Sequence, residues 1–309
     1  MIILPLDKTE RKPIADGRQV RLKECGNIVE IMASESRSQG GYITKLNADE
    51  YVDNRTGEIF EFKHNENRAN DLSNVAKSLQ QGRDILNTNI TDVSKCRWLT
   101  LTYADNMTDG KKLYTDFDNF NRRAREKWGH YEYITCAEPQ GRGAWHLHCV
   151  LIFPNKAPFM ANKDVAECWK QGFVTIKKLD DVDNVGAYLT AYLGDMEMPD
   201  KMDEKMFRSS QIKEVELTDE NGKKLTKKYI KGARLSMYPS GFHIFRWSKG
   251  IKKPNVTMTN YAEAKEKVNG GTLTYSKGVM LLDESSDFSN TLLYEYYNTI
   301  RKPKCQDKM

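Results

Sequence analysis

Residues 138–153, EPQGRGAWHLHCVLIF, decide how the middle of this chain folds. Bulky apolar residues alternate with the two histidines of this stretch, and a period of two residues is typical of a β-strand. His146 and His148 would then lie together on one face of the strand, about 6 to 7 Å apart. The opposite face, directed into the core, is predicted to carry Trp145, Leu147 and Cys149.

A carboxylate at the end of the preceding strand would complete a metal site on the histidine side. Residues 130–138 alternate like a strand, and the turn that follows them contains two glycines. The two segments therefore predict an antiparallel hairpin that brings Glu138 near His146 and His148. Two imidazoles and one carboxylate could hold a divalent cation and leave positions open for a substrate. The alternative is that both histidines are polar residues on the solvated face of a sheet.

The segments around this hairpin predict an α+β fold. Strand-like alternation marks residues 97–103 and, later, residues 172–179. Apolar residues three and four apart predict an amphipathic helix over 113–129, and shorter helices are expected within 162–171 and 181–196. The order strand, helix, strand, strand, helix, strand, helix indicates a central antiparallel sheet with helices on one face.

Three consecutive segments are expected along the 309 residues. Residues 1–90 form an N-terminal extension with a hairpin that turns at Asn54–Gly57 and a helix after it. Residues 91–200 form the domain with the central sheet, and residues 201–309 form a basic C-terminal region. Within this last segment, residues 288–300 are expected to form a terminal helix.

The net charge of the chain is +5, and the positive charge is unevenly distributed. Residues 201–255 hold fourteen Lys or Arg against six Asp or Glu, and they include a predicted hairpin at 213–232. Such a segment either binds nucleic acid or forms an ordinary solvated surface. The candidate DNA contacts in and near it are Lys177, Lys178, Lys227, Lys228, Arg234, Arg246 and Lys249.

The composition argues against several other classes of protein. None of the six cysteines forms a CxxC pair, so a zinc finger or ribbon is not expected. No apolar stretch has the length of a signal peptide or a membrane span, and a cytoplasmic protein with reduced thiols is predicted. The GxxxxGK[ST] phosphate loop does not occur, so a built-in helicase is not expected.

Two tyrosines form a second candidate constellation. Tyr188 and Tyr192 are four residues apart, so on the predicted helix they lie on one face, one turn apart. Two such phenols, taken by themselves, are more often half-buried packing residues than nucleophiles. Their place about forty residues after the histidine strand, on a helix that can pack near the sheet, favours a role in chemistry.

Three stretches, in this order, resemble the motifs of HUH endonucleases, and most closely those of rolling-circle replication initiators from bacterial plasmids, phages and integrative elements. The stretches are RWLTLTY at 97–103, GRGAWHLHCVLIF at 141–153 and VGAYLTAYLG at 185–194. Initiators place the tyrosine motif after the histidines, as here, whereas relaxases usually place it before them. The resemblance covers residues 97 to about 195 and implies an RRM-like or ferredoxin-like sheet.

The resemblance also implies the chemistry of the site. The implied ligands of a Mg²⁺ or Mn²⁺ ion are His146, His148 and Glu138. The implied nucleophiles, which would form a 5′-phosphotyrosine with DNA, are Tyr188 and Tyr192. Many relatives have a lysine between the tyrosines, whereas residues 189–191 here are Leu-Thr-Ala, so Lys177 or Lys178 would have to supply an assisting cation.

The implied activity is metal-dependent, site-specific nicking and joining of one DNA strand. Its substrate would be single-stranded or hairpin DNA at a replication origin, and its partners would be a host helicase and a DNA polymerase. No membrane partner is expected. Two alternatives remain: a two-tyrosine HUH transposase, which would use the same residues, and a non-catalytic origin-binding repressor on a decayed nuclease fold.

Overall fold

A computed structural model of the chain describes residues 2–36, 42–64, 67–70, 72–179, 184–190, 195–197, 212–218, 224–230, 232, 234–282 and 288–300. The chain divides into two compact units. Unit 1 comprises residues 1–64, 87–91 and 252–309, and unit 2 comprises residues 65–86 and 92–251. Both ends of the chain thus build unit 1, a grouping that differs from the three consecutive segments expected from the sequence.

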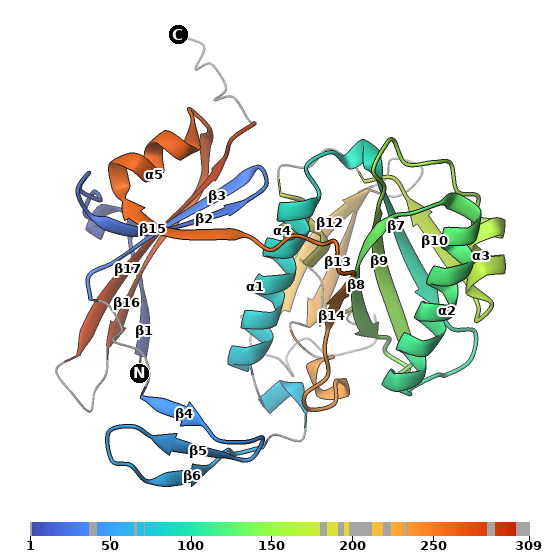
Figure 1. Cartoon of the computed structure of the whole chain (residues 1–309), viewed down its shortest axis with the longest axis horizontal. Helices are drawn as coiled ribbons and strands as arrows, with labels where there is room; N and C mark the ends of the chain where they lie inside the picture. The colour runs from blue at the N-terminus through green and yellow to red at the C-terminus, as the bar shows by residue number, and fades with distance from the viewer. Residues whose placement is uncertain are drawn as a thin grey trace. The chain divides into compact units, whose positions relative to one another are not determined.

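The centre of unit 2 is a five-stranded antiparallel sheet (Figure 1). Its strand order is β10 (Val174–Lys177), β7 (Cys96–Thr102), β9 (Trp145–Ile152), β8 (Glu132–Pro139) and β14 (Phe245–Trp247). The predicted glycine turn joins β8 to β9, and Gly143 in it has a φ of 91°, where residues with a side chain are disfavoured. The predicted α+β fold with a central antiparallel sheet is confirmed.

Helices α2 (Gly110–Trp128) and α3 (Asn162–Trp169) cover one face of this sheet. Helix α2 begins where the Asp109 carboxylate accepts hydrogen bonds from the backbone N–H groups of Lys111 and Lys112, and it ends at Gly129. Its predicted apolar stripe enters the core. The stripe consists of Leu113, Phe117, Phe120 and Ala124, each at most 2% exposed.

Strand β9 divides its side chains between the two faces of the sheet, as its alternation predicts. The face under α2 and α3 receives Trp145, Leu147 and Cys149, each at most 2% exposed. His146 and His148 point to the other face, which we call the histidine face. The side chains opposite them in the register, and therefore on the same face, are Thr100, Thr102, Cys136 and Glu138.

The remaining elements agree with the sequence in most places. The predicted hairpin at 213–232 consists of β12 (Ile212–Thr218) and β13 (Lys224–Ile230), and β11 (Met196–Glu197) pairs with β13. The predicted first helix is α1 (Leu72–Asn89), and the tyrosine segment contains α4 (Val185–Thr190). Short 3₁₀ turns occur at Lys8–Glu10, Arg68–Asn70, Val93–Lys95 and Leu235–Met237.

Unit 1 contains a second, six-stranded antiparallel sheet (Figure 1). Its order is β1 (Ile2–Leu6), β16 (Thr272–Leu282), β17 (Ser289–Asn298), β3 (Ile28–Ser34), β2 (Gln19–Cys25) and β15 (Asn255–Asn260). Helix α5 (Tyr261–Val268) packs on one face of it. The predicted hairpin at Asn54–Gly57 is part of a small sheet of β4 (Ile43–Lys45), β5 (Glu50–Asp53) and β6 (Ile59–Glu61).

The prediction of a helix over residues 288–300 was wrong, because Ser289–Asn298 form the strand β17 between β16 and β3. The segment NTLLYEYYN carries apolar or aromatic residues on both faces of the sheet, which hides the two-residue period. Within the part of the chain that the structure describes, no helix is long and apolar enough to cross a membrane.

Candidate active site

Three predicted ligand side chains converge on the histidine face. His146 lies directly opposite Glu138 in the pairing of β9 with β8, and His148 lies two residues farther along β9. The Nε2 atom of His148 is 3.0 Å from the Oε2 atom of Glu138, and the two imidazole rings are 6.2 Å apart between centroids. The sequence therefore predicted the correct face, hairpin and register for this cluster.

The ring of His148 is held at both nitrogens. Its Nδ1 atom is 3.2 Å from the hydroxyl oxygen of Thr100 on β7, while its Nε2 atom contacts Glu138. The ring of Trp98, one row along the same face, is 6.2 Å from the imidazole. These contacts on both sides fix the orientation of the ring, which is what a metal ligand requires.

The Glu138 carboxylate is the most connected group of the cluster. It is 8% exposed, and its second oxygen, Oε1, forms an ion pair of 2.8 Å with the Nη1 atom of Arg234. The Arg234 side chain is itself only 20% exposed. The sequence offered Arg234 as a candidate DNA contact, but the structure places its guanidinium inside the site as the counter-charge of Glu138.

His146 differs from His148 because its Nε2 atom is buried and has no hydrogen-bond partner among the described residues. Burial, followed by repulsion from a charged His148, lowers its pKa from 6.5 to about 4. The imidazole is therefore neutral at pH 7 and keeps a lone pair for a ligand.

The donor set fits a small divalent cation. A neutral imidazole with an unpartnered nitrogen, a second oriented imidazole and a carboxylate are ligands that Mn²⁺ and, with more oxygen, Mg²⁺ accept. In the described residues no three His, Cys, Asp or Glu side chains are already grouped as ligands of one ion. Glu138 instead contacts His148 and Arg234.

The structure does not place the two candidate nucleophiles against this cluster. Tyr188 lies in α4, but its side chain is outside the described residues, and Tyr192 lies outside them entirely. The described part of α4 is buried at Val185, Gly186 and Thr190, and the Thr190 hydroxyl donates a hydrogen bond to the Gly186 carbonyl. The role of the tyrosines therefore stays a prediction.

The predicted cations on the central sheet divide between its two faces. Lys177 of β10 lies opposite Trp98 of β7, so its exposed side chain is on the histidine face, and exposed Lys178 follows directly after the strand. Arg246 of β14 instead lies opposite Thr135, on the other face, with its guanidinium 4.3 Å from the Tyr114 ring centroid. Lys177 is thus placed for the assisting role that the sequence suggested, whereas Arg246 is not.

The other candidate DNA contacts lie on the hairpin or in a turn. Lys228 forms an ion pair of 3.3 Å with Glu214, and the side chain of Lys227 is outside the described residues. Lys249 is exposed in the turn that follows β14. Of the predicted DNA contacts that the structure describes, Arg234 alone contacts a proposed metal ligand.

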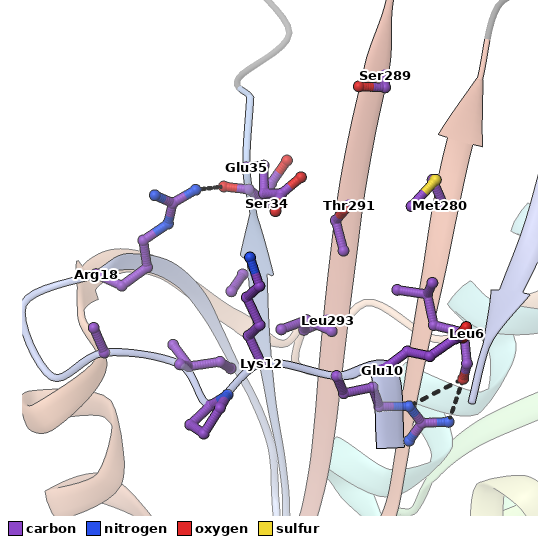
Figure 2. A pocket seen from close by; sticks show the side chains of 15 residues that line it. Leu6, Glu10, Lys12, Arg18, Ser34, Glu35, Met280, Ser289, Thr291 and Leu293 are labelled. Atoms are coloured by element: carbon purple, nitrogen blue, oxygen red, sulfur yellow. Dashed lines mark hydrogen bonds between the residues drawn. The ribbon is translucent and has the colours of Figure 1, made fainter. Parts of the chain in front are cut away.

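A cavity of about 510 Å³ occurs in unit 1 (Figure 2). Its floor consists of side chains from β1, β3, β16 and β17, and residues 10–15 and 18 form its wall. Charges of both signs line it, with Arg11, Lys12 and Arg18 against Glu10 and Glu35. Its chemistry differs from that of the histidine cluster, and none of its lining residues comes from the central sheet of unit 2.

The family of replication-associated proteins of the ORF2 type matches residues 96–197 of this chain. The matched segment begins at the first residue of β7 and ends with β11, so it contains both histidines, Glu138 and α4. Comparisons with curated proteins and with solved structures gave no match. Residues 96–197 are therefore a domain of a replication-associated family, which confirms the resemblance to rolling-circle initiators, while Arg234 and β14 lie outside the matched residues.

Proposed function

We propose that this replication-associated protein starts rolling-circle replication by nicking and rejoining one strand of origin DNA. The observation that carries the proposal is the convergence of His146, His148 and Glu138 on one face of the sheet, within the segment that matches the family. Two imidazoles and a carboxylate on adjacent strands have the composition of a metal site for phosphodiester chemistry.

A Mg²⁺ or Mn²⁺ ion bound by these three side chains would polarise the non-bridging oxygens of the scissile phosphate. The chain's own residues prepare that site. His146 offers a neutral nitrogen without first losing a proton, because its pKa is lowered to about 4. Thr100 orients His148, and Arg234 orients Glu138 while adding positive charge beside the position of the phosphate.

The nucleophile in this proposal is a phenol from the segment of α4, either Tyr188 or Tyr192. Its oxygen forms a bond to phosphorus as the bond from phosphorus to the 3′ oxygen breaks, which leaves a 5′-phosphotyrosine and a free 3′-hydroxyl. The phenol loses its proton and the leaving 3′ oxygen gains one, so the step is balanced. Attack by a later 3′-hydroxyl reverses the reaction and rejoins the strand without a nucleotide cofactor.

The proposed substrate is DNA that is single-stranded at the nick, as a hairpin loop or a melted origin provides. A phosphate within a stacked duplex could not approach side chains on the surface of a sheet. The free 3′-hydroxyl would serve a host DNA polymerase, and a host helicase would separate the strands, because the sequence contains no phosphate loop.

A covalent-adduct assay tests the proposal. The full chain is incubated with a pool of 3′-labelled random single-stranded oligonucleotides and Mn²⁺, and adducts are separated on a denaturing gel. We expect an adduct with the wild type, a loss of at least about 100-fold with His148→Ala, and no adduct when Tyr188→Phe and Tyr192→Phe are combined.

His130→Ala is the matched control, because His130 is an exposed histidine that contacts Glu132 in the same unit. It should form the adduct at the wild-type rate. An adduct that persists in the double tyrosine variant would refute the nucleophile assignment. DNA binding without any adduct in the wild type would instead support the origin-binding repressor.

A further inference from the structure

The six-stranded sheet of unit 1 has two chemically different faces. One face packs against α5, whose Ala264 and Val268 are at most 3% exposed. The strand residues of this packed face are Val20, Leu22, Val29, Ile31, Ala33 and Tyr297. Because side chains alternate along each strand, the residues between them point to the opposite face, which we call the tyrosine face.

Two rows of side chains cross the tyrosine face from β16 to β15. The pairing of β16, β17, β3, β2 and β15 aligns the first row as Lys277, Tyr294, Met32, Arg21 and Met258. It aligns the second row as Tyr275, Tyr296, Glu30, Lys23 and Val256. At the usual spacing between strands, each row is about 19 Å long.

The aromatic rings of these rows form a platform at the β16–β17 end. The rings of Tyr294 and Tyr296 are stacked with centroids 6.5 Å apart and an interplanar angle of 13°, and the ring of Tyr275 is 5.7 Å from that of Tyr296. Tyr275 is 57% exposed. The Nζ atom of Lys277 lies 4.8 Å from the centroid of Tyr294, so a cation accompanies the rings.

The charge of the tyrosine face is positive. Glu30 is its one acidic side chain in the two rows, and it is bonded by both Arg21 and Lys23 at 2.8 and 2.9 Å. Lys277 adds a third positive charge, so three cations stand against one carboxylate. The far ends of the rows, Met258 and Val256, are 57% and 52% exposed, and they extend the surface with apolar area.

From this arrangement we propose that the tyrosine face binds single-stranded DNA, separately from the nicking reaction and in a different unit of the chain. Bases stack on Tyr275 and Tyr294, and the phosphates are attracted by Lys277 and Arg21. Exposed aromatic rings beside cations on an open sheet are the combination that holds unpaired bases, since every base offers a flat face. A duplex hides those faces and leaves the phosphate attraction alone.

Fluorescence anisotropy with a labelled oligothymidylate of about 20 nucleotides tests the proposal on the full chain, in EDTA so that strand cleavage does not contribute. We expect Tyr275→Ala and Tyr294→Ala each to weaken binding about 10-fold, and Tyr275→Phe to restore it because the ring is kept. Lys277→Gln should weaken binding by less and reduce the salt slope by about 0.7.

Matched controls come from the same unit. Tyr42→Ala removes an exposed tyrosine from the small sheet, and Lys267→Gln removes a charge from α5, on the other side of the six-stranded sheet. Neither should change the affinity. The proposal would be overturned if both tyrosine-to-alanine variants bound as tightly as the wild type, or if the wild type bound a duplex of the same length equally well.

The two proposals can fail independently. Tyr275→Ala at saturating oligonucleotide should still form the covalent adduct at the wild-type rate, because it changes a surface of unit 1 and no group of the histidine cluster. Loss of the adduct in His148→Ala, in turn, should leave the anisotropy in EDTA unchanged.

Discussion

The ion pair between Arg234 and Glu138 makes the sharpest stability prediction. Arg234→Gln keeps a polar side chain of similar length but removes the positive charge, so the Glu138 carboxylate loses its 2.8 Å partner in a position where that residue is 8% exposed. Glu138 retains only its contact of 3.0 Å with His148. A buried carboxylate without its counter-charge is destabilising.

The magnitude follows from burial. Removing one partner of a buried ion pair costs about 3–5 kcal/mol. The side chains here are 20% and 11% exposed, and His148 still contacts the carboxylate, so we expect a loss of about 2–3 kcal/mol in the free energy of unfolding of unit 2. For a unit of this size, such a loss lowers the Tm by roughly 5–10 °C.

Differential scanning calorimetry in EDTA measures this change, with Arg122→Gln as the matched control. Arg122 forms an ion pair of 3.0 Å with Glu126 on α2, but both side chains are more than half exposed, so its loss should cost at most about 0.5 kcal/mol. Combining Arg234→Gln with Glu138→Gln should cost less than the sum of the single changes, because no buried charge is left alone.

Mn²⁺ provides an internal check on the same variant. A divalent cation beside Glu138 replaces the missing positive charge, so saturating Mn²⁺ should raise the Tm of Arg234→Gln more than that of the wild type. The reasoning would be refuted if Arg234→Gln melted like Arg122→Gln in EDTA, or if Mn²⁺ stabilised the wild type and the variant equally.

Three further changes test the site and its support. In the metal-free protein, an NMR titration should show His146 neutral down to pH about 4; stability should fall as the pH drops from 6.5 towards 4, since only the unfolded chain takes up that proton, and a pKa near 6.5 would contradict this. Tyr238→Phe removes the hydroxyl that donates a 2.9 Å hydrogen bond to the buried Ala137 carbonyl and should cost about 1 kcal/mol by urea unfolding, whereas an unchanged midpoint would show that the bond adds nothing. Gly82→Ala would drive a methyl group into the Phe245 ring and should lower the stability by about 1–3 kcal/mol, so a variant that melts at a higher temperature would count against this packing.

The fold of unit 2 was predictable because its strands and helices are amphipathic. The alternation of residues 145–149 defined both faces of β9, and the stripe from Leu113 to Ala124 defined the buried side of α2. The short glycine turn then fixed the pairing of Glu138 with His146. Each of these inferences depends on residues close in sequence, where periodicity and turn chemistry act directly.

The parts that sequence reasoning missed depend on contacts between distant segments. Arg234 reaches Glu138, 96 residues away in the chain, because η6 and β14 lie against β8, and no local pattern marks that approach. Strand β17 was mistaken for a helix because Leu293 and Tyr297 face one side of the sheet while Tyr294 and Tyr296 face the other. The union of both chain ends in unit 1 likewise follows from strand pairing across more than 250 residues, as between Ser34 and Leu292.

Pulsed electron paramagnetic resonance of bound Mn²⁺ tests the central claim most directly, because it counts the nitrogen nuclei that are bonded to the ion. With one Mn²⁺ per chain, the account predicts two imidazole nitrogens, reduced to one by His146→Ala and by His148→Ala, and still two in His130→Ala. A nicking-competent protein whose Mn²⁺ carries only oxygen ligands would contradict it.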